Sequence, residues 1–164
     1  MALAPAITDL EQLKGHPALA CLLAWNPAAT TGAKFDRDEM TIYLDRANIR
    51  EACALLRDDA CAFNYLSDIT CVDWYPAEPR FEVVYHLLSI PNKERVRLKV
   101  RLDSASPVVE SLTPLWPGAN YFEREVFDLF GIRFSGHPYL RRLLMPEDWE
   151  GHPLRKDYPV EGYR

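Results

Sequence analysis

The sequence predicts an α+β protein, a two-layer sandwich with a mainly antiparallel sheet and an extended C-terminal arm. Apolar and basic side chains alternate over residues 95–102, which is typical of a strand with one buried and one solvated face. Apolar residues between positions 49 and 56 recur at i, i+3, i+4 and i+7, which indicates an amphipathic helix. Residues 132–164 contain four prolines and three glycines without a sustained period, so we expect this segment to be extended.

The predicted elements follow the order α-β-α-β-β-β-α within 164 residues, a length that suits one domain with one core. We find no repeat, low-complexity tract or linker that would divide the chain. The sequence therefore predicts a single α+β domain over residues 1–134 and a partner-binding C-terminal arm over residues 135–164.

The N-terminal third is predicted to supply two short helices and one strand. Thr8 and Glu11 have the spacing of a capping box, which begins the first helix. A second apolar turn follows up to Trp25, and residues 26–34 have the composition of turns. Apolar side chains then alternate with polar ones over residues 39–45, which predicts a half-buried strand.

Three further strands and a short helix follow the amphipathic helix. Residues 63–75 are rich in β-branched and aromatic side chains, and residues 80–90 form a second run of this kind. The turn at residues 91–92 joins that run to the alternating residues 95–102, so these two strands should pair as an antiparallel hairpin. Residues 107–116 are predicted to form a short helix.

The last predicted helix covers residues 121–130. Asn120 is its expected N-cap, and Gly131 is its expected left-handed C-cap. Arg124 and Asp128 have the i, i+4 spacing of an ion pair. The apolar side of this helix is formed by Phe122, Val126, Leu129 and Phe130, and the charged side by Arg124, Glu125 and Asp128.

The composition excludes several classes of protein. Apolar residues make up 48% and charged residues 26% of the chain, which is ordinary for a globular protein and unlike a disordered or coiled-coil chain. The net charge of -5 gives no overall attraction for nucleic acid or anionic lipid. The apolar run at residues 18–25 is far too short to span a bilayer, and the N-terminus lacks the basic region of a signal peptide.

The four cysteines do not have the spacing of a metal or cluster site. Cys21, Cys53, Cys61 and Cys71 include no C-x-x-C pair, whereas iron–sulfur and structural zinc sites usually draw two thiolates from one turn. No disulfide framework is expected, and we predict four buried reduced thiols. Because a P-loop and a dinucleotide fingerprint are also absent, the sequence predicts no catalytic, cofactor-binding or metal-binding residue in this chain.

The C-terminal arm carries more apolar side chains than a solvated tail would tolerate. Its mixture of apolar and guanidinium groups is the one that protein interfaces favour, so we expect the arm to lie against another surface. The apolar residues are Leu140, Leu143, Leu144, Met145, Trp149, Leu154 and Tyr158, and the basic ones are Arg141, Arg142, Arg155 and Lys156.

Several short motifs follow one another between residues 66 and 159. They are residues 123–132 (EREVFDLFGI), 134–138 (FSGHP), 140–144 (LRRLL) and 153–159 (PLRKDYP), preceded by 66–73 (LSDITCVD), 80–87 (RFEVVYHL) and 116–120 (WPGAN). Together they closely resemble the signature of the C, or 30-kilodalton, subunit of the proton-pumping NADH:quinone oxidoreductase (respiratory complex I). The resemblance covers roughly residues 66–159, and the first 60 residues match only in general plan.

The resemblance implies a non-catalytic peripheral-arm subunit that is needed for assembly. Iron–sulfur clusters, FMN and quinone would be bound by partner subunits, the isolated chain would be inactive, and electron transfer from NADH to quinone coupled to proton translocation would belong to the complex. The expected neighbour is the 49-kilodalton-type quinone-site subunit, on the cytoplasmic side of the bacterial inner membrane, with membrane contact only through partners. The residues that the resemblance assigns to the partner interface are Glu123, Arg124, Glu125, Asp128, His137, Arg141, Arg142, Arg155, Lys156 and Asp157.

Other interpretations stay open. An equivalent subunit of a ferredoxin-, deazaflavin- or hydrogenase-linked membrane complex would carry the same motifs, because the electron-input module lies in other chains. Residues 93–101 hold five basic residues and one glutamate, a net charge of +4, so a stand-alone nucleic-acid-binding module is a remote alternative, although no aromatic residues interleave on that face. His137 and His152 with nearby carboxylates suggest a metal site only weakly, because their spacing of 15 fits no standard ligand motif.

Overall fold

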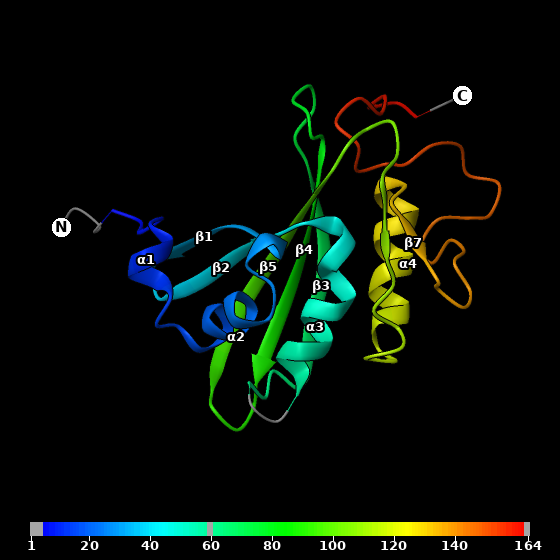
Figure 1. The fold of residues 1–164 in the computed structure, drawn as a ribbon. Helices are drawn as coiled ribbons and strands as arrows, with labels where there is room; N and C mark the ends of the chain where they lie inside the picture. Colours follow the sequence, from blue (N-terminus) through cyan, green and yellow to red (C-terminus); the bar gives the residue numbers. More distant parts are fainter. Residues whose placement is uncertain (1–4, 59–60, 163–164) are drawn as a thin grey trace.

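The computed structural model describes residues 5–58 and 61–162. Five strands form one twisted sheet, and helices α2 (Pro17–Trp25) and α3 (Ile49–Arg57) lie in front of it in the view of Figure 1. Helix α4 (Ala119–Phe130) stands beside strand β3 (Tyr65–Asp73) together with a separate two-stranded sheet, and the C-terminal arm runs around this second group of elements (Figure 1).

The main sheet has the strand order β1-β2-β5-β4-β3. The strands are β1 (Thr30–Asp36), β2 (Glu39–Leu44), β3 (Tyr65–Asp73), β4 (Phe81–Ser89) and β5 (Glu94–Leu102). Strands β2 and β5 run parallel, and the other three neighbouring pairs are antiparallel. The predicted α+β class with a mainly antiparallel sheet is therefore confirmed, as is the hairpin of β4 and β5, which pairs Phe81 with Leu102.

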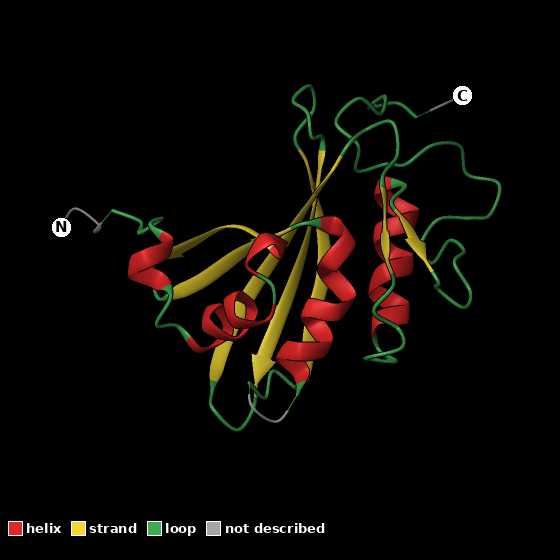
Figure 2. Ribbon diagram, viewed as in Figure 1, coloured by secondary structure: helices red, strands yellow, loops and turns green. Residues whose placement is uncertain are grey.

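Four α-helices accompany the sheet in the part of the chain that the structure describes (Figure 2). They are α1 (Leu10–Leu13), α2 (Pro17–Trp25), α3 (Ile49–Arg57) and α4 (Ala119–Phe130), and short 3-10 turns, η1 and η2, cover Pro27–Ala29 and Arg46–Asn48. The apolar stripe of α3 is buried as its spacing predicts, because one face of the helix packs into the core.

The core lies where the apolar faces of the helices meet one face of the sheet. Along β5, Val96, Leu98 and Val100 are buried in this core, whereas the basic side chains between them belong to the opposite face. Burial of one such aliphatic side chain contributes about 1.5–3 kcal/mol. A shift of the register by one residue would exchange the two faces, so the alternation fixes the pairing of this strand.

Two segments differ from the prediction. Turns were expected over residues 26–34, but Thr30–Asp36 forms the edge strand β1, whose pairing with β2 decides its conformation. The prediction of a helix over residues 107–116 is wrong as well. Val108–Glu110 forms strand β6, which pairs in parallel with β7 (Arg133–Ser135). This pairing joins segments on either side of α4, and no local pattern could reveal it.

The helix ends also correct the expected caps. Asp9, rather than Thr8, caps α1, because its Oδ1 accepts a hydrogen bond of 2.9 Å from the backbone amide of Glu11. Gly118, rather than Asn120, precedes α4. The left-handed Gly131 at the end of α4 is confirmed, with a φ of 76°.

The prediction of four reduced thiols is wrong for two of the cysteines. Cys21 in α2 and Cys61 after α3 form a disulfide, whereas Cys53 and Cys71 are free and buried. The packing of α2 near α3 brings together two sulfur atoms whose residues are 40 positions apart. Cysteine spacing alone does not show such a pair.

Candidate partner interface

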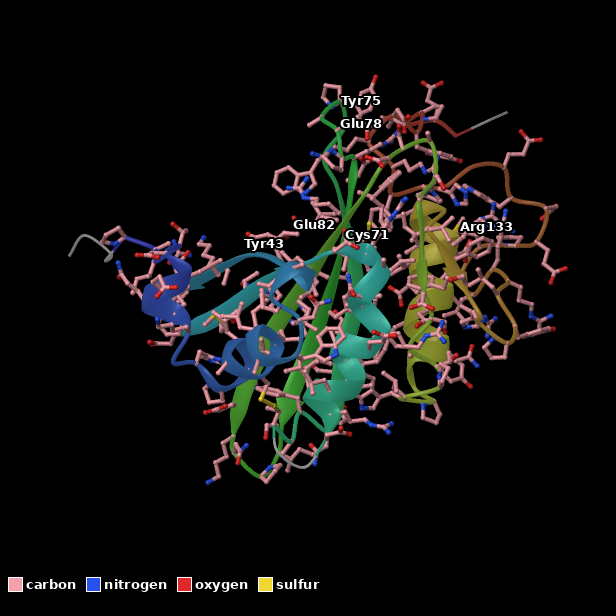
Figure 3. All side chains as sticks on the ribbon, viewed as in Figure 1. Tyr43, Cys71, Tyr75, Glu78, Glu82 and Arg133 are labelled. Atoms are coloured by element: carbon pink, nitrogen blue, oxygen red, sulfur yellow. A yellow bond between two sulfur atoms is a disulfide. The ribbon has the colours of Figure 1, made fainter. Side chains whose placement is uncertain are left out.

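Two clusters of charged groups attach the C-terminal arm to its own domain. One forms on α4, and the other forms where the β3–β4 hairpin meets the end of the arm. Figure 3 shows Tyr75 and Glu78 at the tip of this hairpin, on the side of the molecule where the arm returns. Between residues 136 and 162 the arm contains no helix or strand, as predicted, so side-chain contacts determine its path.

Asp128 is fully buried under the arm. Its Oδ1 accepts a hydrogen bond of 2.7 Å from Arg142 Nη1, and its Oδ2 accepts from the backbone amides of Leu143, Leu144 and Met145 at 2.7–2.9 Å. Burial by itself would raise the pKa of Asp128, but these donors outweigh it and hold the pKa below its usual range. We call these five residues the Asp128 cluster.

Arg142 extends this cluster along the arm. Its Nη2 donates to the carbonyl oxygens of Trp149 and Gly151 at 2.7 and 2.9 Å, so one guanidinium closes a turn of the arm. The prediction of an ion pair between Arg124 and Asp128 is wrong, because Arg142 binds the carboxylate of Asp128 instead. Arg124 instead donates to the carbonyl oxygens of residues 141 and 142, at 3.2 and 3.0 Å.

The second cluster joins β3 and β4 to the end of the arm. Arg80 binds both carboxylate oxygens of Asp73 at 2.9 and 2.8 Å, and both oxygens of Asp157 at 2.9 and 2.6 Å. Asp73 also accepts from the backbone amide of Lys156 at 2.9 Å. Burial opposes ionisation of Asp73, but the hydrogen bonds from Arg80 and two amides lower its pKa to about 2. We call Asp73, Arg80 and Asp157 the Arg80 cluster.

Gly131 allows the arm to cross the C-terminal end of α4 at close range. A Cβ at this position would meet the guanidinium of Arg155 and would lie 2.6 Å from the imidazole of His152. Arg155 Nε donates to the carbonyl oxygen of Phe130 at 2.6 Å, which satisfies an end carbonyl of the helix and places a cation at its negative end.

Glu123 is fully buried on the other side of α4. Its Oε1 accepts from the backbone amide of Leu112 and its Oε2 from the hydroxyl of Ser111, both at 2.6 Å. Burial raises the pKa of Glu123 to about 7, although these donors and the positive charge of Arg50 act in the opposite direction. The carboxyl thus holds the segment after β6 against α4.

The ten residues assigned to the interface by resemblance fall into three groups. Glu123 and Asp128 are buried within the chain; Arg124, His137, Arg142 and Arg155 are half-buried; and Glu125, Arg141, Lys156 and Asp157 are exposed. The guanidinium carbon of Arg141 lies 4.2 Å from the ring centre of the exposed Tyr139. Contacts inside the chain therefore engage most of these residues, and the arm keeps a smaller set of charges at its surface.

The arm also exposes several apolar side chains. Leu144 is 59% exposed, and Leu154 is 51% exposed, far more than leucines of a packed core. Side chains of this kind occur along the whole arm, namely Tyr139, Leu144, Trp149, Leu154 and Val160. A series of exposed apolar groups rimmed by charges is typical of a protein interaction surface.

The basic face of β5 is partly neutralised by acidic neighbours. Lys99 Nζ and Arg101 Nε bind the two carboxylate oxygens of the buried Glu82 at 2.7 and 2.8 Å, and Arg97 pairs with Glu39. Figure 3 labels Glu82 on this part of the sheet. The strand therefore offers fewer unpaired charges to phosphate groups than its sequence suggests.

Sequence reasoning missed several buried polar residues that hold the sheet, α4 and the arm together. Asp73, Arg80 and Glu82 are charged residues at or next to the ends of strands that are otherwise largely apolar, and such residues are seldom buried unless they are paired. Their position in buried strands is a signal that could have found them. Ser111 gave no comparable signal.

Among the described residues, no group of three or more His, Cys, Asp and Glu side chains could hold a metal ion. The two histidines that suggested a metal site lie at backbone carbonyl oxygens instead: His137 Nε2 at 3.3 Å from Asn120, and His152 Nδ1 at 2.9 Å from Asp128. In the same part of the chain no helix is long and apolar enough to cross a membrane.

The fold and the two clusters define a class of α+β protein whose C-terminal arm folds back over its own last helix. Residues 42–164 match the family described as the 30 Kd subunit of respiratory-chain NADH dehydrogenase. The chain belongs to this family, and the resemblance seen in the sequence is confirmed. The matched region includes every residue of both clusters.

Relatives and solved structures agree with this assignment. The C subunit of NADH-quinone oxidoreductase from Roseiflexus sp. (strain RS-1) is 54% identical over 135 residues, which cover 82% of this chain and 78% of that protein. The protein of the same name from Citrifermentans bemidjiense is 52% identical over 126 residues, covering 77% of this chain and 78% of its own length.

Two solved structures resemble the fold. A trypsin-resistant fragment (1-134) of Nqo5 superposes with a TM-score of 0.58 at 38% identity, over 62% of this chain and 83% of the fragment. A chain of the membrane-bound sulfane sulfur reductase, an archaeal respiratory membrane complex, gives a TM-score of 0.75 at 26% identity, over 90% of this chain and 86% of its own.

Proposed function

We propose that this chain is the C subunit of a proton-translocating NADH:quinone oxidoreductase, where it holds neighbouring subunits in place and carries no redox step itself. The observation that supports this most directly is the construction of the arm. The Asp128 and Arg80 clusters fix its inner side to the domain, while its outer side presents exposed apolar residues such as Leu144 and Leu154. An arm ordered in this way loses little further conformational entropy when a partner covers it.

On this proposal, the interface residues have two tasks. The buried and half-buried ones, such as Asp128 and Arg155, give the arm its shape, and the exposed ones, such as Glu125, Arg141 and Lys156, contact the partner. We propose the 49-kilodalton-type quinone-site subunit as that partner. Residues 1–134 then act as the anchoring domain and residues 135–164 as the binding arm.

The location and cofactors of the complex follow from the same proposal. The chain would sit on the cytoplasmic side of the bacterial inner membrane and reach the membrane only through its partners. Iron–sulfur clusters, FMN and quinone would be bound by those partners, and the chain alone would have no NADH:quinone reductase activity.

The first experiment isolates the chain with its native partners. The tagged chain is purified from membranes of its host in mild detergent, and size, bound iron and NADH:quinone reductase activity are measured. A large iron-containing complex with this activity is the expected result. Recovery of an iron-free monomer would contradict the proposal.

A matched pair of variants tests the outer surface of the arm. Leu144 and Ile90 are both 59% exposed, but Ile90 lies after β4, away from the arm. Leu144→Gln is expected to weaken binding to the partner about tenfold, which corresponds to about 1.4 kcal/mol of binding free energy, and so to lower the yield of assembled complex, whereas Ile90→Gln leaves the yield unchanged. Because both sites are exposed, the melting temperature of the isolated chain should stay nearly constant in both. If the two variants assemble equally well, Leu144 does not belong to the interface.

A second candidate is the equivalent subunit of a related respiratory complex with another electron donor. The similarity to a chain of the sulfane sulfur reductase, over 90% of this chain, favours keeping it. A large iron-containing complex without NADH activity would point to this candidate. The remote nucleic-acid alternative requires salt-dependent binding by the monomer, and the pairing of Lys99 and Arg101 with Glu82 weighs against it.

A further inference from the structure

The Cys21–Cys61 disulfide joins two elements of the helical layer. Cys21 is half-buried in α2, and Cys61 is 3% exposed in the connection between α3 and β3. The 40-residue separation between them contains β1, β2 and α3. Neither cysteine belongs to the Asp128 cluster or to the Arg80 cluster, and α2 lies apart from the C-terminal arm in Figure 1.

We propose that Cys21 and Cys61 form a reversible thiol–disulfide site, through which the stability of this protein responds to the redox state of its surroundings. This site is independent of the proposed function of the arm. Its reaction partners are cellular dithiols and small-molecule disulfides.

The cross-link acts where the fold is otherwise held by few polar contacts. Helix α2 has nine residues and no side-chain hydrogen bond at its N-cap. Its attachment therefore depends on apolar packing, chiefly of the fully buried Leu19 and Leu22. A disulfide across a 40-residue loop restricts the unfolded chain, and its loss makes opening of α2 and of the elements within the loop easier.

Thiol–disulfide exchange at this site begins with attack on the more accessible of the two sulfur atoms. A thiolate of a dithiol attacks Sγ of Cys21, which is more accessible than Cys61, and forms a mixed disulfide with Cys21. Cys61 leaves as a thiolate and takes up a proton. The second thiol of the reductant then attacks the mixed disulfide and frees Cys21, so the dithiol is oxidised to a disulfide and two electrons reach the pair. A small-molecule disulfide reverses these steps.

The other two cysteines are poor competitors for this exchange. Both are buried, and burial raises the pKa of Cys71 to about 12 and that of Cys53 further still. Exchange needs the thiolate, which is scarce at neutral pH in such surroundings. Cys53, a free buried cysteine on α3, therefore provides a matched control.

The test uses the full chain, treated with oxidised glutathione or with dithiothreitol. Denatured oxidised protein should contain two free thiols and reduced protein four, and peptide mapping of the oxidised form should show Cys21 linked to Cys61. Reduction should lower the melting temperature by on the order of 10 °C, and hydrogen exchange in α2 should become faster.

Two variants separate this effect from any cost of the substitutions themselves. The melting temperature of Cys21→Ala should not respond to dithiothreitol, whereas Cys53→Ala should keep the full response. Four free thiols after treatment with oxidised glutathione would overturn the proposal, and so would an equal response of wild type and Cys21→Ala. Thiol counting and peptide mapping on the wild type decide the matter even where a variant fails to fold.

Discussion

At the scale of single residues, the number and charge of hydrogen-bond donors decide how a buried carboxyl behaves. Asp128 faces a guanidinium and three amides, and its pKa stays below the usual range. Glu123 faces only an amide and a hydroxyl, and its pKa is raised to about 7. Two acidic residues of one helix, both fully buried, therefore affect stability in opposite directions as the pH changes.

Glu123→Gln should remove one of these pH dependences. The pKa of Glu123 in the folded protein, about 7, lies above its ordinary value of 4.5. The stabilisation that Glu123 contributes is therefore complete below about pH 4.5 and is lost as the pH rises through 7. The difference between the two pKa values corresponds to about 3 kcal/mol of stability. Urea unfolding at pH 5 and pH 8 should show a smaller loss of stability in Glu123→Gln than in the wild type. Glu125→Gln, at an exposed position of the same helix, should behave like the wild type.

Asp128→Ala should destabilise the isolated chain, because it leaves the half-buried Arg142 and three amides without their acceptor. Removing one partner of a buried ion pair typically costs about 3–5 kcal/mol. Glu147→Ala is the control, since its pair with Arg141 is 3.7 Å long and lies on the surface, where such pairs are worth about 0–1 kcal/mol. Denaturant unfolding compares the two, and similar losses in both would show that the Asp128 cluster does not stabilise the fold.

At the scale of elements, the end of α4 and the arm form one unit. Gly131 ends the helix in the left-handed conformation, and the space above it is filled by Arg155 and His152. Arg155 in turn binds the carbonyl oxygen of Phe130, so the arm supplies a hydrogen-bond donor that the helix end lacks. The helix and the arm should therefore lose order together when this crossing is disturbed.

Gly131→Ala tests the crossing, with Gly118→Ala as its matched control at the other end of the same helix. At Gly131 an alanine would be strained by its φ of 76° and would displace two side chains, so we expect a loss of about 1–3 kcal/mol and easier cleavage of the arm by trypsin. Gly118 has a φ of -63° and open space around it, so alanine should be neutral or stabilise by up to about 1 kcal/mol. Equal effects in the two variants would refute this account of Gly131.

At the scale of the whole molecule, buried carboxyl groups make stability depend on pH at both ends of the range. Asp73 has a pKa of about 2, below its ordinary 3.8, so its contribution is complete above about pH 3.8 and is lost as the pH falls through 2. The contribution of Glu123 is lost in the other direction, above about pH 4.5. Urea midpoints should therefore fall as the pH drops below about 3.8. Above about pH 4.5 they should fall relative to those of Glu123→Gln, whereas burial lowers the pKa of the four histidines and acts on stability in the opposite direction there. Midpoints that stay level below pH 3.8 would contradict the assignment of Asp73.

Local patterns of residues were enough to predict the fold class, most of the elements and the family. Alternation over residues 95–102 and the helical period over 49–56 are local, because each reports which side of one element faces the core. The family motifs are local as well, since they are short runs of adjacent residues. For the same reason Gly131 was found correctly as a helix end.

Contacts between distant segments, in contrast, could not be predicted from local patterns. The strand β6 needs β7 as its partner, the Cys21–Cys61 pair needs α2 packed near α3, and Asp128 reaches Arg142 rather than Arg124 because the arm returns over α4. Each of these contacts joins segments that are distant in sequence, and its energy depends on burial and on donors supplied from elsewhere. Periodicity and spacing describe one segment at a time, so they placed the charged residues in the arm and on the last helix but could not show that the chain uses most of them to hold itself together.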